Sequence, residues 1–524
     1  MSSRLSLIDA SLLIGESRRV PFHLGALSVY DFPDGVNETE YLHNFASFLK
    51  SSEPFAQPFG HIAKTGRLGV YGPIHWERDE HIEYDYHIRH SALPKPGRFR
   101  ELFALVSRLH SILLDRSRPL WEIHLIEGLE GRKFATFSKF HHCMIDGVRG
   151  TKLMSLMHSN NPNDAPNLHP FSESAKNTLR KDAGADLIKN ASHRDFKAVS
   201  EALSEQLGHT INITRAVTEN AKVWLGKDTS GLDVPLRNIP STILNQKIQG
   251  ARRFVAQSWS FNRIRRLAKS YDGTINDAIL AMVSGALVIY LKAHGDLPKE
   301  SLKTLTVISL RDKSNPDASN AIGNVATDLA TNIKDPVERA LAIQKSAQIG
   351  KNHLKALTAS EAALYMALTM SPIAFITLMG LAGKFPPYNT VVSNVPGPRE
   401  QLYLGGAKLI GSYPASMVVD GIALNFTIVS TNDTLDFGIT ACRRSVPQVQ
   451  RVIDYLEDSL QELENAFGLA PWDKSEVDPQ KIVSQPNKAA EKPKPKARRE
   501  TNTSKESKPR KKIAKKQSKP KIKN

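Results

Sequence analysis

Two adjacent histidines, His141 and His142, are the residues of this chain best suited by type and position to acid–base chemistry. A neutral imidazole, with an unperturbed pKa near ~6.5, accepts a proton from a hydroxyl group at neutral pH. The histidines follow an apolar run at 134–140 that predicts a β-strand. Neighbouring side chains at a strand end point to opposite faces, so at most one of the two histidines is expected to face a given cleft.

Asp146 and Gly147 come just after the histidines and precede a predicted helix. The apolar residues of that helix share one face: Leu153, Leu156 and Met157. A buried aspartate needs an arginine or backbone N–H groups as partners. Asp146 held in this way would fix the loop that presents the histidine.

The same segment permits three other interpretations. His141, His142 and Asp146 are metal-ligand types, although metal sites usually have three or four protein ligands and no further cluster stands out in the sequence. Cys143 is a nucleophile type beside a histidine, although adjacent side chains diverge rather than form a hydrogen bond. A purely structural histidine pair is the third interpretation. The local spacing alone leaves all of them open.

The hydrophobic pattern places the histidines in an α/β chain. Predicted strands cover 22–30, 121–126, 133–140, 253–261, 305–310, 389–393, 423–430 and 435–441. Predicted helices cover 99–114, 263–271, 276–290 and 446–467, with further helical stretches around 195–207 and 212–225. Because glycines separate the strands 121–126 and 133–140, a hairpin is expected there.

Two short motifs stand at the ends of these elements. Pro119, Leu120 and Trp121 stand at the entrance to the hairpin, where packing is favoured over direct catalysis. Asn276 and Asp277 open the long apolar helix, and they either cap it or take part in the chemistry.

Residues 362–382 are apolar, uncharged and nearly long enough to cross a bilayer. Pro372 interrupts this run, and a proline inside a helix removes a backbone hydrogen bond. The favoured prediction is a buried or interfacial helical pair that is broken at Ser371–Pro372. A helix that lines an acyl-chain tunnel has the same pattern.

Positive charge is concentrated at the C-terminus. The formal net charge is +17, and residues 481–524 hold 17 Lys+Arg against 3 Asp+Glu, or +14. The remaining 53 Lys+Arg and 50 Asp+Glu give +3, which argues against nucleic-acid binding by the whole protein. The tail from about residue 475 is expected to be disordered, because it has almost no large apolar side chains. It is expected to contact anionic phospholipid, with nucleic acid and simple solubilisation as alternatives.

The chain has only two cysteines, Cys143 and Cys442, which excludes a disulfide framework and a cysteine-rich metal site. Asp9 and Glu16 interrupt the apolar run near the N-terminus, so no secretory signal is expected. A reducing, cytoplasmic setting is the expectation.

The segment His141-His142-x-x-x-Asp146-Gly147 resembles the HHxxxDG signature of the chloramphenicol-acetyltransferase-like superfamily. Further motifs follow in order: Leu7-Ile8-Asp9-Ala10, His23-Leu24-Gly25, Arg118-Pro119-Leu120-Trp121-Glu122, Thr274-Ile275-Asn276-Asp277, Ser309-Leu310-Arg311, Gly323-Asn324 and Ser393-Asn394-Val395-Pro396-Gly397-Pro398. Together they resemble the bacterial wax ester synthase/acyl-CoA:diacylglycerol acyltransferase family over about residues 5 to 468. The basic tail lies outside this resemblance.

The resemblance implies an α/β fold of two chloramphenicol-acetyltransferase-like domains. Each is a mixed β-sheet flanked by helices, with an active-site tunnel between the two. The expected parts are an N-terminal domain at 1–165, a helical connector at 166–239, a C-terminal domain at 240–470 and a disordered Lys/Pro-rich tail at 471–524. The run 394–398 is expected to form a crossover or the tunnel rim.

The resemblance also implies CoA-dependent O-acyl transfer. A long-chain acyl group passes from acyl-CoA to a diacylglycerol or a fatty alcohol, with no metal, no other cofactor and no covalent acyl-enzyme. His142 falls on the general base, and Asp146 falls on a structural aspartate that pairs with an arginine, for which Arg311 is a candidate. His141 and Gly147 complete the motif, and Asn276 falls near the active site.

The basic tail favours a cytoplasmic location that is peripheral to the inner membrane or to lipid inclusions. Two alternatives to this function remain. One is acyl transfer or condensation with another acceptor. The other is a non-catalytic protein of lipid droplets or nucleic acid that acts through the basic tail.

Overall fold

The computed structural model describes residues 3–50, 55–65, 72–145, 147–166, 168–182, 218–227, 230–309, 322–357 and 359–473. These residues all belong to one compact unit, Met1–Ser484. The predictions for Asp146, Arg311, the stretch 195–207 and almost all of the basic tail lie outside the described residues. Of the stretch predicted at 212–225, residues 218–224 are helical.

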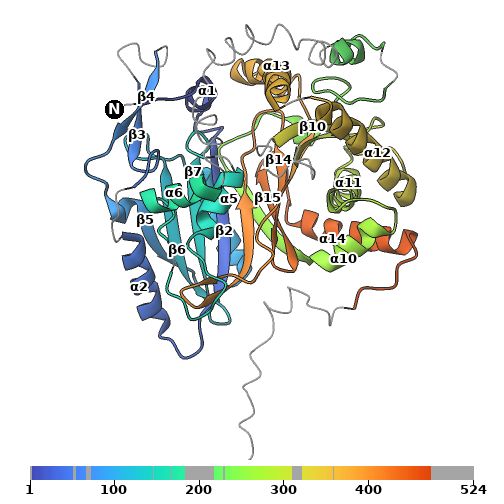
Figure 1. Ribbon diagram of the computed structural model, residues 1–524. Coiled ribbons are helices and arrows are strands. Elements are labelled where there is room, and N and C mark those ends of the chain that lie inside the picture. Colours follow the sequence, from blue (N-terminus) through green and yellow to red (C-terminus); the bar gives the residue numbers. More distant parts are fainter. Residues whose placement is uncertain are drawn as a thin grey trace, which may run out of the picture. The chain divides into compact units, whose positions relative to one another are not determined.

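A six-stranded sheet holds the histidine motif, with the strand order β12-β13-β2-β7-β6-β5 (Figure 1). Its strands are β2 (His23–Asp31), β5 (Ile88–Ala92), β6 (Trp121–Leu129), β7 (Lys133–His141), β12 (Tyr403–Leu404) and β13 (Ala407–Ala415). β6 and β7 pair antiparallel, which confirms the predicted hairpin. Every position of β7 is buried, because the strand lies between β2 and β6 and both of its faces are covered.

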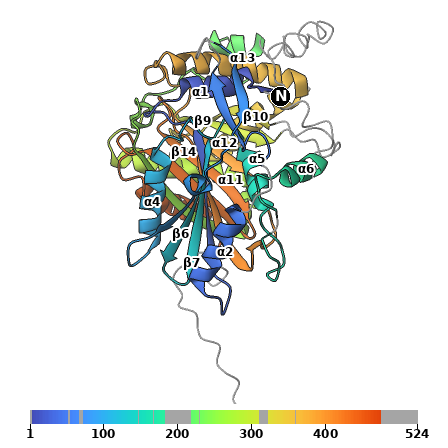
Figure 2. The same cartoon turned by 90° about the vertical axis from the view of Figure 1, so that its left-hand side faces the viewer.

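Helices and a small sheet surround this first sheet. The helices are α1 (Leu7–Gly15), α2 (Glu38–Lys50), α3 (Tyr84–His87), α4 (Phe99–Ser111), α5 (Gly147–Ser155) and α6 (Glu173–Asp182). The small sheet has the order β1-β4-β3, from β1 (Ser3–Arg4), β3 (His61–Thr65) and β4 (Ile74–Arg78). Figure 2 brings α4 into view beside the first sheet, and this helix contacts both β2 and the second sheet.

The second sheet is mixed and has the order β10-β9-β11-β14-β15-β8. Its strands are β8 (Arg252–Ser260), β9 (Lys303–Ser309), β10 (Ile322–Asp328), β11 (Thr390–Val395), β14 (Leu424–Thr431) and β15 (Thr434–Cys442). Its helices are α10 (Phe261–Lys269), α11 (Ile275–Ala293), α12 (Pro336–Lys355), α13 (Ala359–Leu378) and α14 (Arg451–Ala466). The mixed sheet with flanking helices confirms the predicted fold class, since β11 runs parallel to β9 and β14 while the other pairs are antiparallel.

By length and composition, one helix of the described residues, α11, is apolar enough to cross a membrane. Most of it is buried, and it contacts α10, α12 and α14. Figure 1 draws it between α12 and α14. This is the position of a core helix, and α11 supplies much of the apolar core of the second half.

The first sheet includes two strands, β12 and β13, from the C-terminal half of the chain. After β11 and the run 394–398, the chain crosses to the first sheet, where β13 pairs with β2. The predicted crossover is therefore confirmed, and residues 403–415 of the predicted C-terminal domain belong to the first sheet. β13 also packs on β15 so closely that a Cβ atom at Gly438 would lie 1.8 Å from the Pro414 carbonyl oxygen.

Two predictions for helices are wrong. α13 continues through Pro372, where a break was expected. The carbonyl that Pro372 leaves without a backbone donor is that of Leu368, and the Ser371 hydroxyl donates to it at 3.1 Å. The last helix begins at Arg451 rather than 446, because Gln448 adopts a left-handed backbone (φ 52°) that ends a regular helix.

Candidate active site

The histidine motif stands where β7 ends. His141 is the last residue of the strand and lies opposite His23 of β2. Its N–H donates to the Leu120 carbonyl at 2.9 Å, and the N–H of His142 donates to the Phe22 carbonyl at 2.8 Å. Backbone hydrogen bonds on two sides therefore fix the position from which both side chains emerge.

The two histidines occupy different surroundings. The His141 side chain is completely buried, whereas His142 is half-buried. The different burial agrees with the expectation that adjacent side chains at a strand end point to opposite faces. The accessible member of the pair is His142.

His141 belongs to a buried network around Glu16. The Nδ1 atom of His141 accepts the Cys143 N–H at 3.1 Å, so in the neutral ring Nε2 carries the proton. That Nε2 lies 3.5 Å from Glu16 Oε1. The same carboxylate accepts the Phe22 N–H at 3.0 Å and pairs with Arg116 at 3.1 Å. Glu16 thus contacts the ring of His141 and also the residue whose carbonyl holds His142.

The electrostatics of this network keep Glu16 ionised. Burial by itself raises the pKa of the Glu16 carboxyl. The contact with His141, the Phe22 N–H and the Arg116 guanidinium outweigh burial, so the pKa of Glu16 ends below its usual value. At neutral pH the buried carboxylate therefore offers a fixed negative charge to His141.

Two more buried histidines, His23 and His110, are neutral. His23 Nε2 lies 2.8 Å from the His110 carbonyl, and His110 Nε2 lies 3.0 Å from the Ser416 carbonyl. Burial lowers the pKa of His110 to about 3 and that of His23 well below its usual value. They link β2, α4 and the segment after β13 without adding charge.

Cys143 does not have the properties of a nucleophile. Its side chain is buried, and burial together with the charges of Asp9 and Glu16 raises the pKa of the thiol well above its usual value. Because the thiolate is the reactive form, a cysteine held in this way is inert. Within the ranges that the structure describes, no three His, Cys, Asp or Glu side chains gather as a metal site would require.

Pro119, Leu120 and Trp121 pack, as expected. Trp121 is fully buried, stacks on His87 with ring centroids 4.4 Å apart and donates its indole N–H to the Phe59 carbonyl at 2.8 Å. The segment has one direct link to the motif, because the Leu120 carbonyl accepts the His141 N–H. Its contribution is therefore to hold the end of β7.

The start of α11 separates the roles of Asn276 and Asp277. The Thr274 hydroxyl accepts the Asp277 N–H at 3.2 Å, and the Asp277 carboxylate accepts the Thr274 N–H at 2.8 Å. This reciprocal capping box assigns Asp277 to the helix cap. Asn276 is half-buried beside it.

Gly147 is exposed at the first position of α5, and a Cβ atom there would meet nothing within 4 Å. Packing among the described residues therefore does not explain the glycine. Asp146 and its predicted partner Arg311 lie outside the described residues, so their pairing stays a prediction.

Sequence reasoning missed Glu16, Arg116 and Lys139. Lys139 lies two residues before His141 on β7, with its side chain buried 3.8 Å from Glu122 and donating to the Ile112 carbonyl. Burial lowers the pKa of Lys139 to about 8, against the opposing effect of Glu122. The only signal in the sequence was that Glu16 and Lys139 stand near apolar residues. Their partners, Arg116 and Glu122, are not neighbours in the sequence, so the pairs could not be recognised.

Known proteins resemble this chain over most of its length. The model of the wax ester synthase/diacylglycerol acyltransferase catalytic domain matches residues 5–279, and that of the C-terminal domain of the same proteins matches residues 318–464. A putative diacylglycerol O-acyltransferase of Mycobacterium tuberculosis is 40% identical over 466 residues, which cover 89% of this chain and 100% of that protein. The O-acyltransferase WSD of Acinetobacter baylyi is 35% identical over 460 residues, covering 88% of this chain and 96% of that protein.

Solved structures give the same result. The wax ester synthase/diacylglycerol acyltransferase of Marinobacter aquaeolei matches with a TM-score of 0.68 and 35% identity, covering 89% of this chain and 100% of that one. A condensation domain of the CDA synthetase matches with a TM-score of 0.52 at 13% identity, covering 90% of this chain and 97% of that one. At that identity the second likeness concerns the fold alone.

Proposed function

This chain belongs to the wax ester synthase/diacylglycerol acyltransferase family and is an acyltransferase, and from this premise we propose that it transfers a long-chain acyl group from acyl-CoA to an alcohol. The acceptor is a diacylglycerol or a long-chain fatty alcohol, the two acceptor classes that the names of the relatives indicate. The observation that carries the proposal is the half-buried His142, held at a strand end by the Phe22 carbonyl.

His142 acts as the general base in this proposal. Its imidazole takes the proton of the acceptor hydroxyl while that oxygen attacks the thioester carbonyl carbon. The tetrahedral intermediate carries a negative oxygen that needs hydrogen-bond donors, and the half-buried Asn276 amide is the candidate for this role. When the carbon–sulfur bond breaks, the leaving CoA thiolate takes the proton back from His142. The ester and CoA are the products, and these reaction steps need neither a metal nor a covalent acyl-enzyme.

His141 is a positioning residue in the same proposal. Its buried ring connects the β7 end with Glu16, and Glu16 also holds the Phe22 N–H. Because Phe22 accepts the His142 N–H, a shift of Glu16 or His141 displaces the backbone of the base. Asp146 is proposed to fix the following turn through an arginine such as Arg311.

The test is release of CoA thiol from palmitoyl-CoA by the wild type and by His142→Ala, with hexadecanol and dioleoylglycerol as parallel acceptors. We expect acceptor-dependent release that falls at least about a hundredfold in the variant, the usual contribution of a positioned base. A variant such as His90→Ala, which changes a partly exposed histidine away from the motif, is the control for a general effect of histidine removal. Equal rates for wild type and His142→Ala would overturn the assignment of the base. The ratio of the two acceptor rates names the main product.

A peripheral location at a lipid surface is part of the same proposal. Two features support it: the +14 charge of residues 481–524 and a group of exposed apolar side chains on and after α13. That group consists of Leu368, Phe375, Met379, Leu381 and Phe385. Basic segments are attracted to anionic lipid, and exposed apolar side chains insert at its surface.

A further inference from the structure

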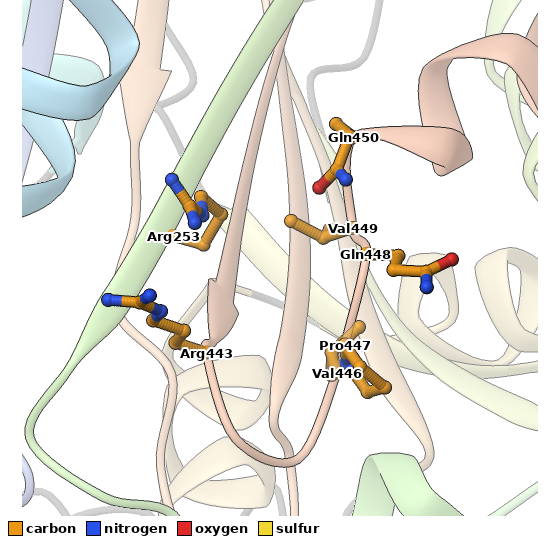
Figure 3. Close-up of a pocket in the computed structure, with 7 residues that line it drawn as sticks. All are labelled: Arg253, Arg443, Val446, Pro447, Gln448, Val449 and Gln450. Carbon is orange, nitrogen blue, oxygen red and sulfur yellow. The ribbon is translucent and has the colours of Figure 1, made fainter.

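A pocket of about 250 Å³ opens at the edge of the second half, where β8 begins and β15 ends. Figure 3 shows two arginines on one side of it and a turn on the other. The lining residues are Arg253, Arg443, Val446, Pro447, Gln448, Val449 and Gln450. No acidic side chain is among them.

The two arginines have no acidic partner within the described part of the chain. No carboxylate there pairs with Arg253 or Arg443, and no acceptor there takes a hydrogen bond from either guanidinium group. Other arginines of the same half are paired, as Arg263 is with Glu464 at 2.8 Å and Arg339 with Glu462 at 2.7 Å. Two unpaired guanidinium groups on one cavity repel each other, and an anion between them removes that repulsion.

The turn opposite the arginines favours the same kind of ligand. Gln450 is the residue before the first turn of α14, so the positive end of this 16-residue helix faces the pocket edge. The Gln450 side chain adds an amide donor at the pocket edge, whereas Figure 3 shows the Gln448 amide on the far side of the turn. Guanidinium groups bind phosphate and carboxylate groups through paired hydrogen bonds, and phosphate is the anionic group that the acyl-CoA donor of the proposed reaction carries.

A short segment connects the pocket with the base. Arg252, the neighbour of Arg253, donates to the Arg19 carbonyl at 2.9 Å. From Arg19 the segment runs to Phe22, whose carbonyl accepts the His142 N–H. Residues 19–22 therefore connect the strand that lines the pocket with the backbone of His142.

We propose that this pocket binds a phosphate group at the nucleotide end of the acyl-CoA donor. Acyl-CoA carries its phosphates and its thioester at opposite ends of a flexible arm, so a phosphate site is required at a distance from the base. The proposal rests on the proposed function, because it names where the donor of that reaction is held.

The first test compares two thioesters in steady-state kinetics. Palmitoyl-CoA carries the phosphates, and the palmitoyl thioester of N-acetylcysteamine has none. In the double variant Arg253→Gln/Arg443→Gln, we expect the KM for palmitoyl-CoA to rise at least about tenfold, since charge-assisted hydrogen bonds are lost. We expect kcat with palmitoyl-CoA, and kcat/KM for the N-acetylcysteamine thioester, to stay within about twofold. Arg444→Gln, an exposed arginine outside the lining, is the matched control.

The second test does not depend on turnover. Titration calorimetry with adenosine 3′,5′-bisphosphate measures phosphate binding directly, and the double variant is expected to lose at least about tenfold in affinity relative to wild type and Arg444→Gln. If bisphosphate binding is lost in the double variant while no acyl acceptor is used by wild type, the pocket stands and the proposed function fails. An unchanged KM for palmitoyl-CoA, or equal bisphosphate affinity in all variants, overturns the pocket assignment. Loss of binding to phosphatidylglycerol vesicles with an unchanged KM would instead assign the arginines to a lipid headgroup and overturn it equally.

Discussion

The Nε2 atom of His141 lies 3.5 Å from the Oε1 atom of Glu16, and both side chains are completely buried. The first histidine of the motif is therefore part of the structure that holds the second. This division of roles explains why two adjacent histidines are found where the proposed reaction needs one base.

Replacing Glu16 tests this positioning role. Glu16→Ala leaves the buried His141 ring and the Phe22 N–H without their acceptor, while Arg116 remains accessible to water, so we expect the free energy of unfolding to fall by about 1–3 kcal/mol. Glu16→Gln keeps the acceptor for the Phe22 N–H and should lose less stability. Denaturant titration measures both, and Glu80→Gln, a change in an exposed carboxylate, is the control.

The kinetic readout separates positioning from simple instability. At a temperature where Glu16→Gln is fully folded, we expect kcat to fall about tenfold or more, because the backbone that carries His142 is no longer fixed. The KM for palmitoyl-CoA should change little. A Glu16→Gln enzyme with wild-type kcat would show that Glu16 serves stability alone.

The lowered pKa of Glu16 predicts a pH dependence with a definite sign. A carboxylate whose pKa in the folded protein is below its unfolded value stabilises the fold at pH values above the unfolded value, near ~4.3. That contribution is lost as the pH falls through the lower, folded pKa. The stability difference between wild type and Glu16→Gln should therefore be largest at pH 6–7 and shrink on acidification below about pH 4. A difference that stays constant across this range would contradict the ionised, paired state of Glu16.

The lowered pKa of Lys139 predicts a change of stability at alkaline pH. Burial lowers its pKa to about 8, below the unfolded value near ~10.4. Between these values the unfolded chain binds more protons than the folded one, so the stability contributed by this lysine rises as the pH increases from about 8 toward 10. Thermal unfolding of wild type and Lys139→Met over this range should show a gain for the wild type that the variant lacks. Parallel curves would mean that Lys139 stays fully charged in the fold.

The strand pattern could be predicted from the sequence, whereas the network around the base could not. The hairpin of β6 and β7 follows from local alternation and glycine positions, so the end of β7 at His141 was within reach of sequence reasoning. Glu16 is different, because a buried carboxylate is recognised only by partners that folding brings to it. The pocket could not be predicted either. Residues 446–450 line it because Gln448 has a left-handed backbone, whereas a helix was predicted to begin at 446. The pairing of β13 with β2 joins segments that are far apart in the chain, and no local periodicity specifies it.

Two glycines should respond oppositely to the same substitution. Gly438→Ala puts a Cβ atom 1.8 Å from the Pro414 carbonyl oxygen, so β13 and β15 must separate. We expect a loss of about 1–3 kcal/mol in unfolding free energy, as in overpacked cores. Gly147→Ala meets nothing within 4 Å and should leave the unfolding free energy within about 1 kcal/mol of wild type. Thermal melts of both variants decide this, and a strongly destabilised Gly147→Ala would reveal packing from residues outside the described ranges.

Gly147→Ala also bears on the reaction. If the variant is as stable as wild type but its kcat/KM falls, the glycine is needed for the reaction. It then either leaves space for a substrate or allows the backbone conformation of the turn near His142. Wild-type kinetics in a stable Gly147→Ala protein would remove Gly147 from the functional residues of the motif.

Lipid-surface binding is predicted to depend on the basic tail. A chain that ends at residue 480 lacks the +14 charge of residues 481–524, and each basic residue near an anionic surface contributes about 1 kcal/mol. In cosedimentation with vesicles, we expect the shortened chain to lose at least about tenfold in affinity for phosphatidylglycerol-containing membranes and most of its salt sensitivity. Binding to vesicles of phosphatidylcholine alone should be weak in both. Phe375→Ser/Met379→Ser, in exposed apolar residues of and just after α13, tests the apolar part, with Ile112→Ser as the control at another exposed apolar residue. If the shortened chain binds anionic vesicles as the full chain does but loses affinity for DNA, the tail is a nucleic-acid contact, and its proposed role at the lipid surface is wrong.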